Sequence, residues 1–261
     1  MKKILCALLC FFTLMSNIAL GQTQEEMAKE LANPIASLIS VPFQNNFHFG
    51  TGDKNGFKYT LNMQPVVPIS LGDNWNLISR TIVPIVYQND IVGNTSQSGV
   101  GDLVQSLFFS PKKPTEKGLI WGAGPVFLIP TASDASIGLE KLGVGPTAVA
   151  LKISGQYTYG MLVNHIISVA GDDARSDLNA AFFQPFVARM MGKGLSLSLG
   201  SENTYSWNHE AFSGMTGIYA NQVLNFGKQM VQLGGGPKIL YGKNSPTNIG
   251  FRINVILLFP K

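Results

Sequence analysis

The chain has 261 residues and a formal net charge of +4, to which Lys2 and Lys3 at the N-terminus contribute. Without them about +2 remains, scattered along the sequence, which excludes the dense basic surface that nucleic-acid binding requires. Charged residues are only 13% of the chain, whereas glycine contributes 28 residues and phenylalanine 16, a composition rich in turns and aromatic rings and poor in ordinary soluble surface.

Residues 1–21 have the organisation of a secretory signal peptide. Lys2 and Lys3 precede an apolar run over residues 4–15, and the tripeptide ALG at 19–21 has the small residues that a signal peptidase needs. The apolar run, about 12 residues long, is shorter than the roughly 20 of a membrane-spanning helix. Because both cysteines fall within this leader, we expect the mature chain to begin at Gln22 with no disulfide and no cysteine metal site.

Residues 22–36 are predicted to form a short helical segment. The stretch TQEEMAKEL places Met27 and Leu31 on one side of a helix. This helix must end before Pro34, because the residue that precedes a proline avoids helical backbone geometry.

From residue 37 onward the hydrophobic pattern has the period of two that is typical of a β-strand. Phe57, Tyr59 and Leu61, for example, alternate with Lys58 and Thr60, and the pattern recurs over 195–207 and 247–259. Turn signals divide this region into about twelve segments. They lie near 37–49, 57–70, 75–87, 99–110, 118–130, 142–153, 157–169, 178–190, 195–207, 215–226, 229–241 and 247–259.

The connections between these segments alternate in length. Longer polar connections at 50–56, 88–98, 131–141, 171–177, 208–214 and 242–246 are separated by mostly tight ones. Each segment is long enough to cross a bilayer when tilted, which takes roughly 9 to 11 residues. Outer-membrane barrels have this rhythm, with short periplasmic turns and longer outer loops.

Residues 37–261 are therefore predicted to form an all-β domain, a transmembrane antiparallel up-and-down β-barrel of about 12 strands in the cell outer membrane. A soluble β-sandwich would also alternate apolar and polar residues, but its polar face would carry many more charges. In a barrel the apolar face contacts lipid, the polar face lines the lumen, and closure removes the unpaired strand edges.

Aromatic residues at the predicted strand ends support this prediction. Their rings would lie at the level of the lipid headgroups, where one end of the ring is apolar and the other is wet. Phe259 also lies near the C-terminus, where the barrel-assembly machinery is expected to bind an aromatic residue. The aromatic set is Trp75, Tyr87, Trp121, Tyr157, Tyr205, Trp207, Tyr241 and Phe259.

Prolines within the predicted strands conflict with a regular ladder, because a proline has no N–H to donate. Three of them end the strings GAGP (122–125), GVGP (143–146) and GGGP (234–237). Glycine before proline leads us to expect β-bulges or sharp bends at these strings.

Several stretches resemble a known family. They are NPIASLISVPFQNNF (33–47), QPVVPISLGDNWNLISRTIVPIVYQ (64–88), SGVGDLVQSLFFSP (98–111), WGAGPVFLIPTA (121–132) and the closing INVILLFPK. Together they resemble outer-membrane proteins labelled as transporters or as "MetA-pathway of phenol degradation" proteins. The resemblance covers nearly the whole mature chain. It implies a barrel of about twelve strands that moves small hydrophobic or aromatic compounds.

The sequence contains no catalytic signature. His48, His165 and His209 have no second histidine or carboxylate at ligand spacing, so no metal site is predicted. Ser201 lies mid-strand on the predicted lipid face, outside any G-x-S-x-G motif, although a triad can assemble from distant strands. The glycine strings precede no helix and no G-K-[ST] sequence, which argues against a phosphate loop. We expect no enzymatic activity and no cofactor.

Charged residues inside the strands are the most informative candidates for function. On the lipid face a basic residue near the midplane would cost roughly 2 to 4 kcal/mol, so these side chains should point into the lumen or lie near an interface. They either pair with one another as a polar filling or line a narrow water-filled passage and set its selectivity. The lumen-lining candidates are Arg80, Asp102, Glu202, Lys238, Arg252 and Asn254.

Three functions stay open at this stage. The first is a channel or transporter for small solutes, the second is a structural or adhesive barrel with a filled lumen, and the third is an outer-membrane lipid hydrolase. The expected partners are outer-membrane lipid, the barrel-assembly machinery and small solutes. The N-terminal helix would lie on the periplasmic rim, enter the barrel as a plug, or be a frayed leader. A barrel of twelve strands is intermediate between filled small barrels and open porins, so its size decides nothing.

Overall fold

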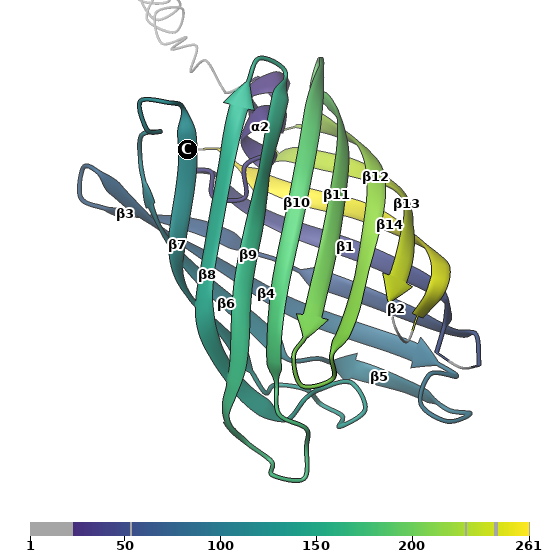
Figure 1. Ribbon diagram of the computed structural model, residues 1–261. Coiled ribbons are helices and arrows are strands. Elements are labelled where there is room, and N and C mark those ends of the chain that lie inside the picture. Colours follow the sequence, from purple (N-terminus) through teal and green to yellow (C-terminus); the bar gives the residue numbers. More distant parts are fainter. Residues whose placement is uncertain (1–22, 53, 228, 243–244, 261) are drawn as a thin grey trace, which may run out of the picture.

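A computed structural model describes residues 23–52, 54–227, 229–242 and 245–260. The signal peptide expected at residues 1–21 lies outside the described residues. One short helix precedes an all-β domain (Figure 1). The elements are α2 (Gln24–Leu31), β1 (Ile39–Thr51), β2 (Gly56–Met63), β3 (Val66–Leu71), β4 (Trp75–Asn89), β5 (Ser96–Val100), β6 (Leu103–Pro111), β7 (Leu119–Ile129), β8 (Lys141–Ser154), β9 (Tyr157–Gly171), β10 (Asn179–Gly192), β11 (Leu195–Ser206), β12 (Ala211–Phe226), β13 (Gln229–Gly242) and β14 (Ser245–Phe259).

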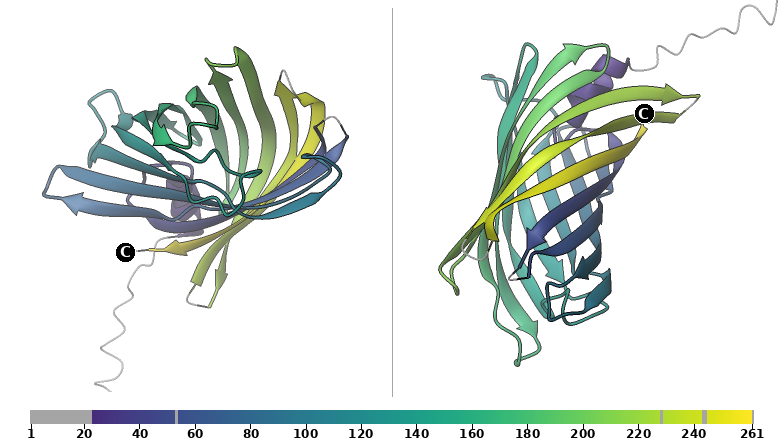
Figure 2. Two further views of the ribbon diagram at one scale, coloured as in Figure 1. Left: turned by 90° about the horizontal axis from the view of Figure 1, so that it is seen from below. Right: turned by 90° about the vertical axis from the view of Figure 1, so that its right-hand side faces the viewer.

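The strands form one closed antiparallel barrel, in which from β6 to β14 each strand pairs with the next one in sequence (Figure 2). The first and last strands close it, with Ile39 of β1 opposite Phe259 of β14 and His48 opposite Gly250. β2 and β3 both pair with β4 and are two halves of one barrel strand, and so are β5 and β6. The prediction of a twelve-stranded up-and-down barrel with a short N-terminal helix is therefore confirmed.

The two ends of the barrel differ in their connections. At the tight-turn end the chain reverses at 72–74, 112–118, 155–156 and 193–194, while the long-loop end carries 90–95, 130–140 and 172–178. The connection expected at 242–246 is shorter in the structure, where β13 ends at Gly242 and β14 begins at Ser245. Helix α2 and the final residues of β14 both lie at the tight-turn end, as an even number of strands requires (Figure 1).

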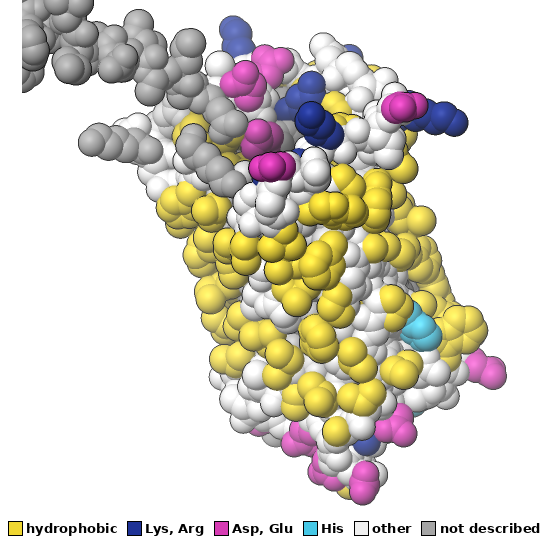
Figure 3. All heavy atoms as spheres, turned by 90° about the vertical axis from the view of Figure 1, so that its left-hand side faces the viewer, with side chains coloured by type: hydrophobic (Ala, Val, Ile, Leu, Met, Phe, Trp, Pro, Cys, Tyr) yellow, Lys and Arg dark blue, Asp and Glu magenta, His cyan; other side chains and the backbone are white. Residues whose placement is uncertain are grey.

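The outer face of the barrel is apolar along its middle. In β11, Leu195, Leu197 and Leu199 are exposed, whereas Ser196 between them is buried. Figure 3 shows apolar side chains covering the middle of one face, with acidic and basic side chains gathered toward both ends. Such a band matches the hydrocarbon layer of a bilayer, in which only outward-facing residues meet lipid. Among the described residues, no helix has the length and apolar character to span a membrane.

Aromatic rings lie at both ends of this apolar face. At the tight-turn end Trp75 and Trp121 are in edge contact, with ring centroids 5.9 Å apart. Toward the long-loop end Tyr205 contacts Trp207 at 4.8 Å, and Phe212 stacks on Tyr241 at 6.0 Å. Residues predicted from the sequence to form two girdles thus occupy the two ends of the strands, where interfacial rings are expected.

The expected bulges at the Gly-Pro strings are wrong at two of the three positions. The ladders keep one register through 122–125 and through 234–237, and only the third string has a shift beside it, between Leu142 and Gly143. The glycines instead allow the backbones of neighbouring strands to lie close together. A Cβ on Gly124, Gly145 or Gly236 would lie well inside contact distance of a carbonyl oxygen of the adjacent strand. Glycine is required there because neighbouring backbones come unusually near each other.

Helix α2 enters the mouth of the barrel at the tight-turn end. Thr23 caps it, because its hydroxyl accepts the Glu26 N–H while the Glu26 carboxylate accepts the Thr23 N–H. Met27 and Ala28 are buried against inward-facing residues of the barrel wall. The chain that follows carries Ile35 into a second apolar cluster. The first cluster includes Leu38, Ala188, Met190, Val223 and Leu258, and the second includes Ile78, Phe108, Val149, Leu151 and Leu162.

Residues 24–38 therefore form a plug that narrows the lumen at the tight-turn end. Of the three placements of the N-terminal helix that the sequence left open, the structure shows the one inside the barrel. The predicted amphipathic side is correct for Met27, which packs on the wall, and Leu31 lies beside the same cluster.

A basic residue on the outer face should destabilise the barrel, while the same residue facing the lumen should not. Leu199→Arg places a cation in the middle of the apolar band, and we expect unfolding in lipid vesicles to become easier by about 2 to 4 kcal/mol. Thr204→Arg, on the inward face of the same strand, is the matched control. Denaturant titration with a boiled and unboiled gel measures both, and equal losses would contradict the assignment of faces.

Candidate functional site

The interior of the barrel holds two cavities that meet near its middle. One, of about 250 Å³, lies beneath the plug and is lined by Ala28, Leu31 and Pro34 among others. The other, of about 290 Å³, extends toward the long-loop end and is lined by Asn164, Leu178 and Thr204 among others. The residues common to both linings are Gln44, Gln64, Arg80, Leu162, Gln184 and Glu202.

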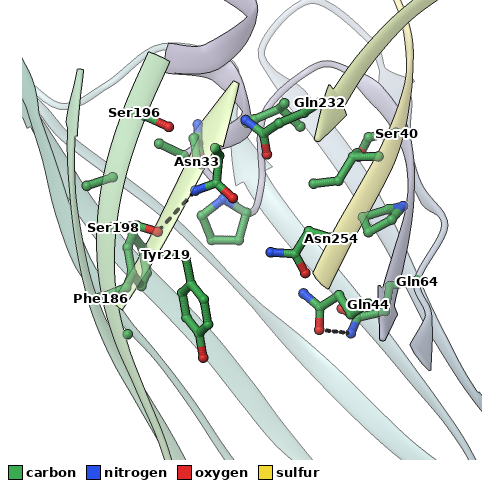
Figure 4. Close-up of a pocket in the computed structure, with 18 of the residues that line it drawn as sticks. Asn33, Ser40, Gln44, Gln64, Phe186, Ser196, Ser198, Tyr219, Gln232 and Asn254 are labelled. Carbon is green, nitrogen blue, oxygen red and sulfur yellow. Dashed lines mark hydrogen bonds between the residues drawn. The ribbon is translucent and has the colours of Figure 1, made fainter. Parts of the chain in front are cut away.

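The lining of the first cavity is rich in amides and hydroxyls (Figure 4). Gln64 and Gln44 lie side by side on the lumen wall, and Gln64 Nε2 donates to Gln44 Oε1 at 2.8 Å. The side chain of Asn254 is buried, and its Oδ1 has no hydrogen-bond partner among the described residues. A buried amide oxygen without a protein partner suits a wet interior, where water or a polar solute completes its hydrogen bond.

An ion pair inside the lumen joins β11 and β14. Arg252 Nη1 donates to Glu202 Oε1 at 2.8 Å, and the Arg252 guanidinium lies 5.2 Å from the centre of the Tyr219 ring. Asn46 Oδ1 accepts from Arg252 Nε at 2.7 Å and from Lys238 Nζ at 2.8 Å. These contacts hold both cations against the wall, so the Glu202 charge is already compensated by Arg252.

Arg80 is placed differently from Arg252. Its Nη2 donates to Gln64 Oε1 at 2.9 Å, and it has no ion-pair partner among the described residues. Lys58 occupies an inward-facing position opposite His48 of β1. On the lumen side of the described strands, basic side chains therefore outnumber the acidic one, Glu202.

The candidates predicted from the sequence fall into three groups. Arg80, Glu202, Arg252 and Asn254 line the first cavity, and Lys238 is joined to Arg252 through Asn46. Asp102 lies instead in the break between β5 and β6. Its carboxylate accepts the N–H groups of Ala132 and Leu139, so it holds the loop 130–140. Another charged residue of a strand, Arg189 of β10, lies over the Tyr157 ring on the outer face at the tight-turn end.

Sequence reasoning missed the amides that surround these charges. Asn46, Gln44, Gln64 and Gln184 were not selected, although alternation alone places Gln64 on the same face as Lys58. Neutral amides are common on both faces of a strand, so their presence in the sequence does not by itself indicate a lumen position as a charge does. In 43–49 the adjacent pair Asn45 and Asn46 also obscures which asparagine faces inward.

Ion pairs connect the loops at the long-loop end. The Asp177 carboxylate forms an ion pair with Lys141 Nζ at 3.0 Å and accepts a hydrogen bond from the Ser168 hydroxyl at 3.0 Å. The hydrogen bond from Lys141 is the main reason that the pKa of Asp177 is lowered. Arg175 pairs with Glu140 at 3.1 Å and donates to the carbonyls of 135 and 138. The loop between β7 and β8 is thus fastened to the loop between β9 and β10.

A serine hydrolase needs a histidine beside its nucleophile, and none of the described contacts of Ser201 is with a histidine. The Ser201 hydroxyl is bound to Tyr241 Oη at 2.9 Å, Asn203 Nδ2 at 2.8 Å and Thr216 Oγ1 at 2.9 Å. His165 Nε2 is bound to Asn179 instead, at 2.8 Å. A serine nucleophile requires a base that accepts its proton. Within the described residues no group of histidine, cysteine and acidic side chains could hold a metal.

Solved structures with the same fold are outer-membrane barrels. An outer membrane channel from Pseudomonas putida F1 superposes with a TM-score of 0.67 at 16% identity, over 85% of this chain and 96% of that one. The NanC porin superposes with a TM-score of 0.52 at 10% identity, over 83% of this chain and 98% of that one. At these identities the likeness concerns the fold.

No protein-family model matches the chain, and no curated protein matches it. The phenol-degradation family therefore stands as a resemblance of sequence stretches, while the wider class, an outer-membrane β-barrel, is supported by the fold.

Removing the partner of Arg252 should destabilise the barrel. We expect Glu202→Leu to lower the free energy of unfolding by about 3 kcal/mol, because it leaves a buried guanidinium without its carboxylate. Glu202→Gln keeps a hydrogen-bond acceptor and should lose less. The double variant Glu202→Leu with Arg252→Met should recover much of the loss. Denaturant titration in vesicles measures these three variants and the single Arg252→Met, and strict additivity of Glu202→Leu and Arg252→Met in the double variant would contradict the pairing.

Proposed function

We propose that this protein is a channel of the outer membrane that passes small solutes through the barrel lumen. The proposal rests mainly on one observation, that the two cavities have six lining residues in common, so that one polar lining continues from beneath the plug toward the long-loop end. The apolar outer band, the predicted signal peptide and the fold shared with channels support the outer-membrane location.

The lining also bears on which solutes would pass. The sequence resemblance implies hydrophobic or aromatic compounds, yet Gln44, Gln64 and Gln184 surround the passage where the cavities meet. A solute that carries a polar group would replace the hydrogen bonds that these amides make with water. We therefore propose solutes that combine a polar group with a small body.

The plug favours a second candidate, a barrel whose filled lumen conducts nothing. Met27 and Ile35 are buried in apolar clusters with residues of the barrel wall, as side chains of a protein core are. A loosely attached leader would not be packed in this way. The two candidates differ in a single measurement, since only a channel gives solute flux across a bilayer.

We expect the purified barrel to conduct in planar bilayers and to let small sugars swell liposomes. Met27→Asp should increase conductance, because a carboxylate cannot remain in the apolar cluster and the plug would leave the mouth. Thr23→Asp is the matched control, since Thr23 is exposed and aspartate also caps helices. Failure of both the native and the Met27→Asp protein to pass any solute would favour the filled barrel.

A further inference from the structure

We propose that the lumen binds small organic carboxylates and that Arg80 is the residue that holds the carboxylate. This inference deepens the proposed channel function and rests on it. Arg80 is suited to the role by its position, because it lines both cavities where they meet, and by its unused hydrogen-bonding capacity.

The guanidinium of Arg80 has donors to spare. Arginine has five N–H groups in a planar fork that fits a carboxylate with two parallel hydrogen bonds. Only one of them is engaged in the described structure, in the bond from Nη2 to Gln64 at 2.9 Å. No carboxylate of the described residues lies within ion-pair distance of Arg80.

Glu202 does not fill this place. It lines the same two cavities and attracts Arg80 electrostatically, but the group in contact with its Oε1 is Arg252, at 2.8 Å. Arg252 is further held by Asn46 and Tyr219, so the pair is fixed at the β14 side of the lumen. The positive charge of Arg80 is therefore the one at the junction without a bound counter-charge among the described residues.

The surrounding charges add to its attraction for anions. Lys58 and Lys238 lie on the same inward face, and among the described residues the hydrogen-bond partner of the Lys238 ammonium is the neutral amide of Asn46. A passage with low-dielectric walls concentrates such a field, which raises the local concentration of anions. Rings of basic side chains give anion pores their selectivity in the same way.

The second cavity indicates the rest of the ligand. Beside the amides and hydroxyls of its lining, this cavity has a group of aliphatic and aromatic side chains, so it offers an apolar surface as well as polar groups. At about 290 Å³ it is close to the lower limit of ligand pockets, about 300 Å³, which suits a short carbon chain. The apolar part of the lining is Ile82, Val104, Ile166, Leu178 and Phe182.

The test measures ion selectivity and block in planar bilayers. In a potassium chloride gradient we expect the native channel to prefer chloride, and Arg80→Gln to lower the chloride-to-potassium permeability ratio by about threefold or more. Glutamine can still bond to Gln64, so folding should be preserved. Arg189→Gln is the matched control, because it removes an arginine from the outer face and should leave the ratio unchanged.

Butanoate and butanamide then serve as probes of the same size. We expect butanoate to block the chloride current of the native channel, the neutral amide to have no effect, and acetate to block less because it lacks the apolar chain. Arg80→Gln should lose most of the butanoate block, and Arg80→Lys should keep the selectivity but weaken the block, since lysine has no fork.

The outcomes separate the two proposals. A folded barrel that passes no current overturns the channel function and this inference with it. A channel that conducts but prefers potassium, or whose butanoate block survives Arg80→Gln, overturns only the carboxylate site at Arg80.

Discussion

The requirement that every backbone N–H and C=O be paired within a hydrocarbon layer determines this structure. Ten residue pairs between β1 and β14, from Ile39 with Phe259 to His48 with Gly250, close the sheet and leave no free edge. Once the sheet is closed, alternate residues must face lipid or lumen. The apolar band, the aromatic ends and the polar interior are all consequences of that one closure.

Closure also decides how the charges are accommodated. Because a cation facing lipid is costly, Lys58, Arg80, Lys238 and Arg252 face the lumen, where the described strands supply a single carboxylate, Glu202. Arg252 takes the carboxylate of Glu202, Lys238 shares Asn46 with it, and Arg80 is left with a neutral amide. A structural filling would be expected to balance its charges, so an interior with surplus positive charge fits a passage for anions better than an inert core.

The plug gives the passage its asymmetry. Its apolar contacts narrow the tight-turn end, while the long-loop end is bordered by loops held through Asp102, Lys141 and Arg175. Polar residues common to both cavities lie between the two. Flow through the lumen would therefore be controlled at the plug and selected at Arg80, two places that can be altered independently.

The sequence by itself determined the strands, their faces and the rhythm of their connections, because a period of two and turn residues are local properties. It also identified Arg80, Glu202 and Arg252 as inward-facing, since charge is excluded from lipid. Only the tertiary structure decided that Glu202 contacts Arg252 rather than Arg80, that Asp102 supports a loop, and that residues 24–38 fill the mouth. Each of these depends on which groups from distant parts of the chain come together, and those distances are set by barrel closure, which no local pattern encodes.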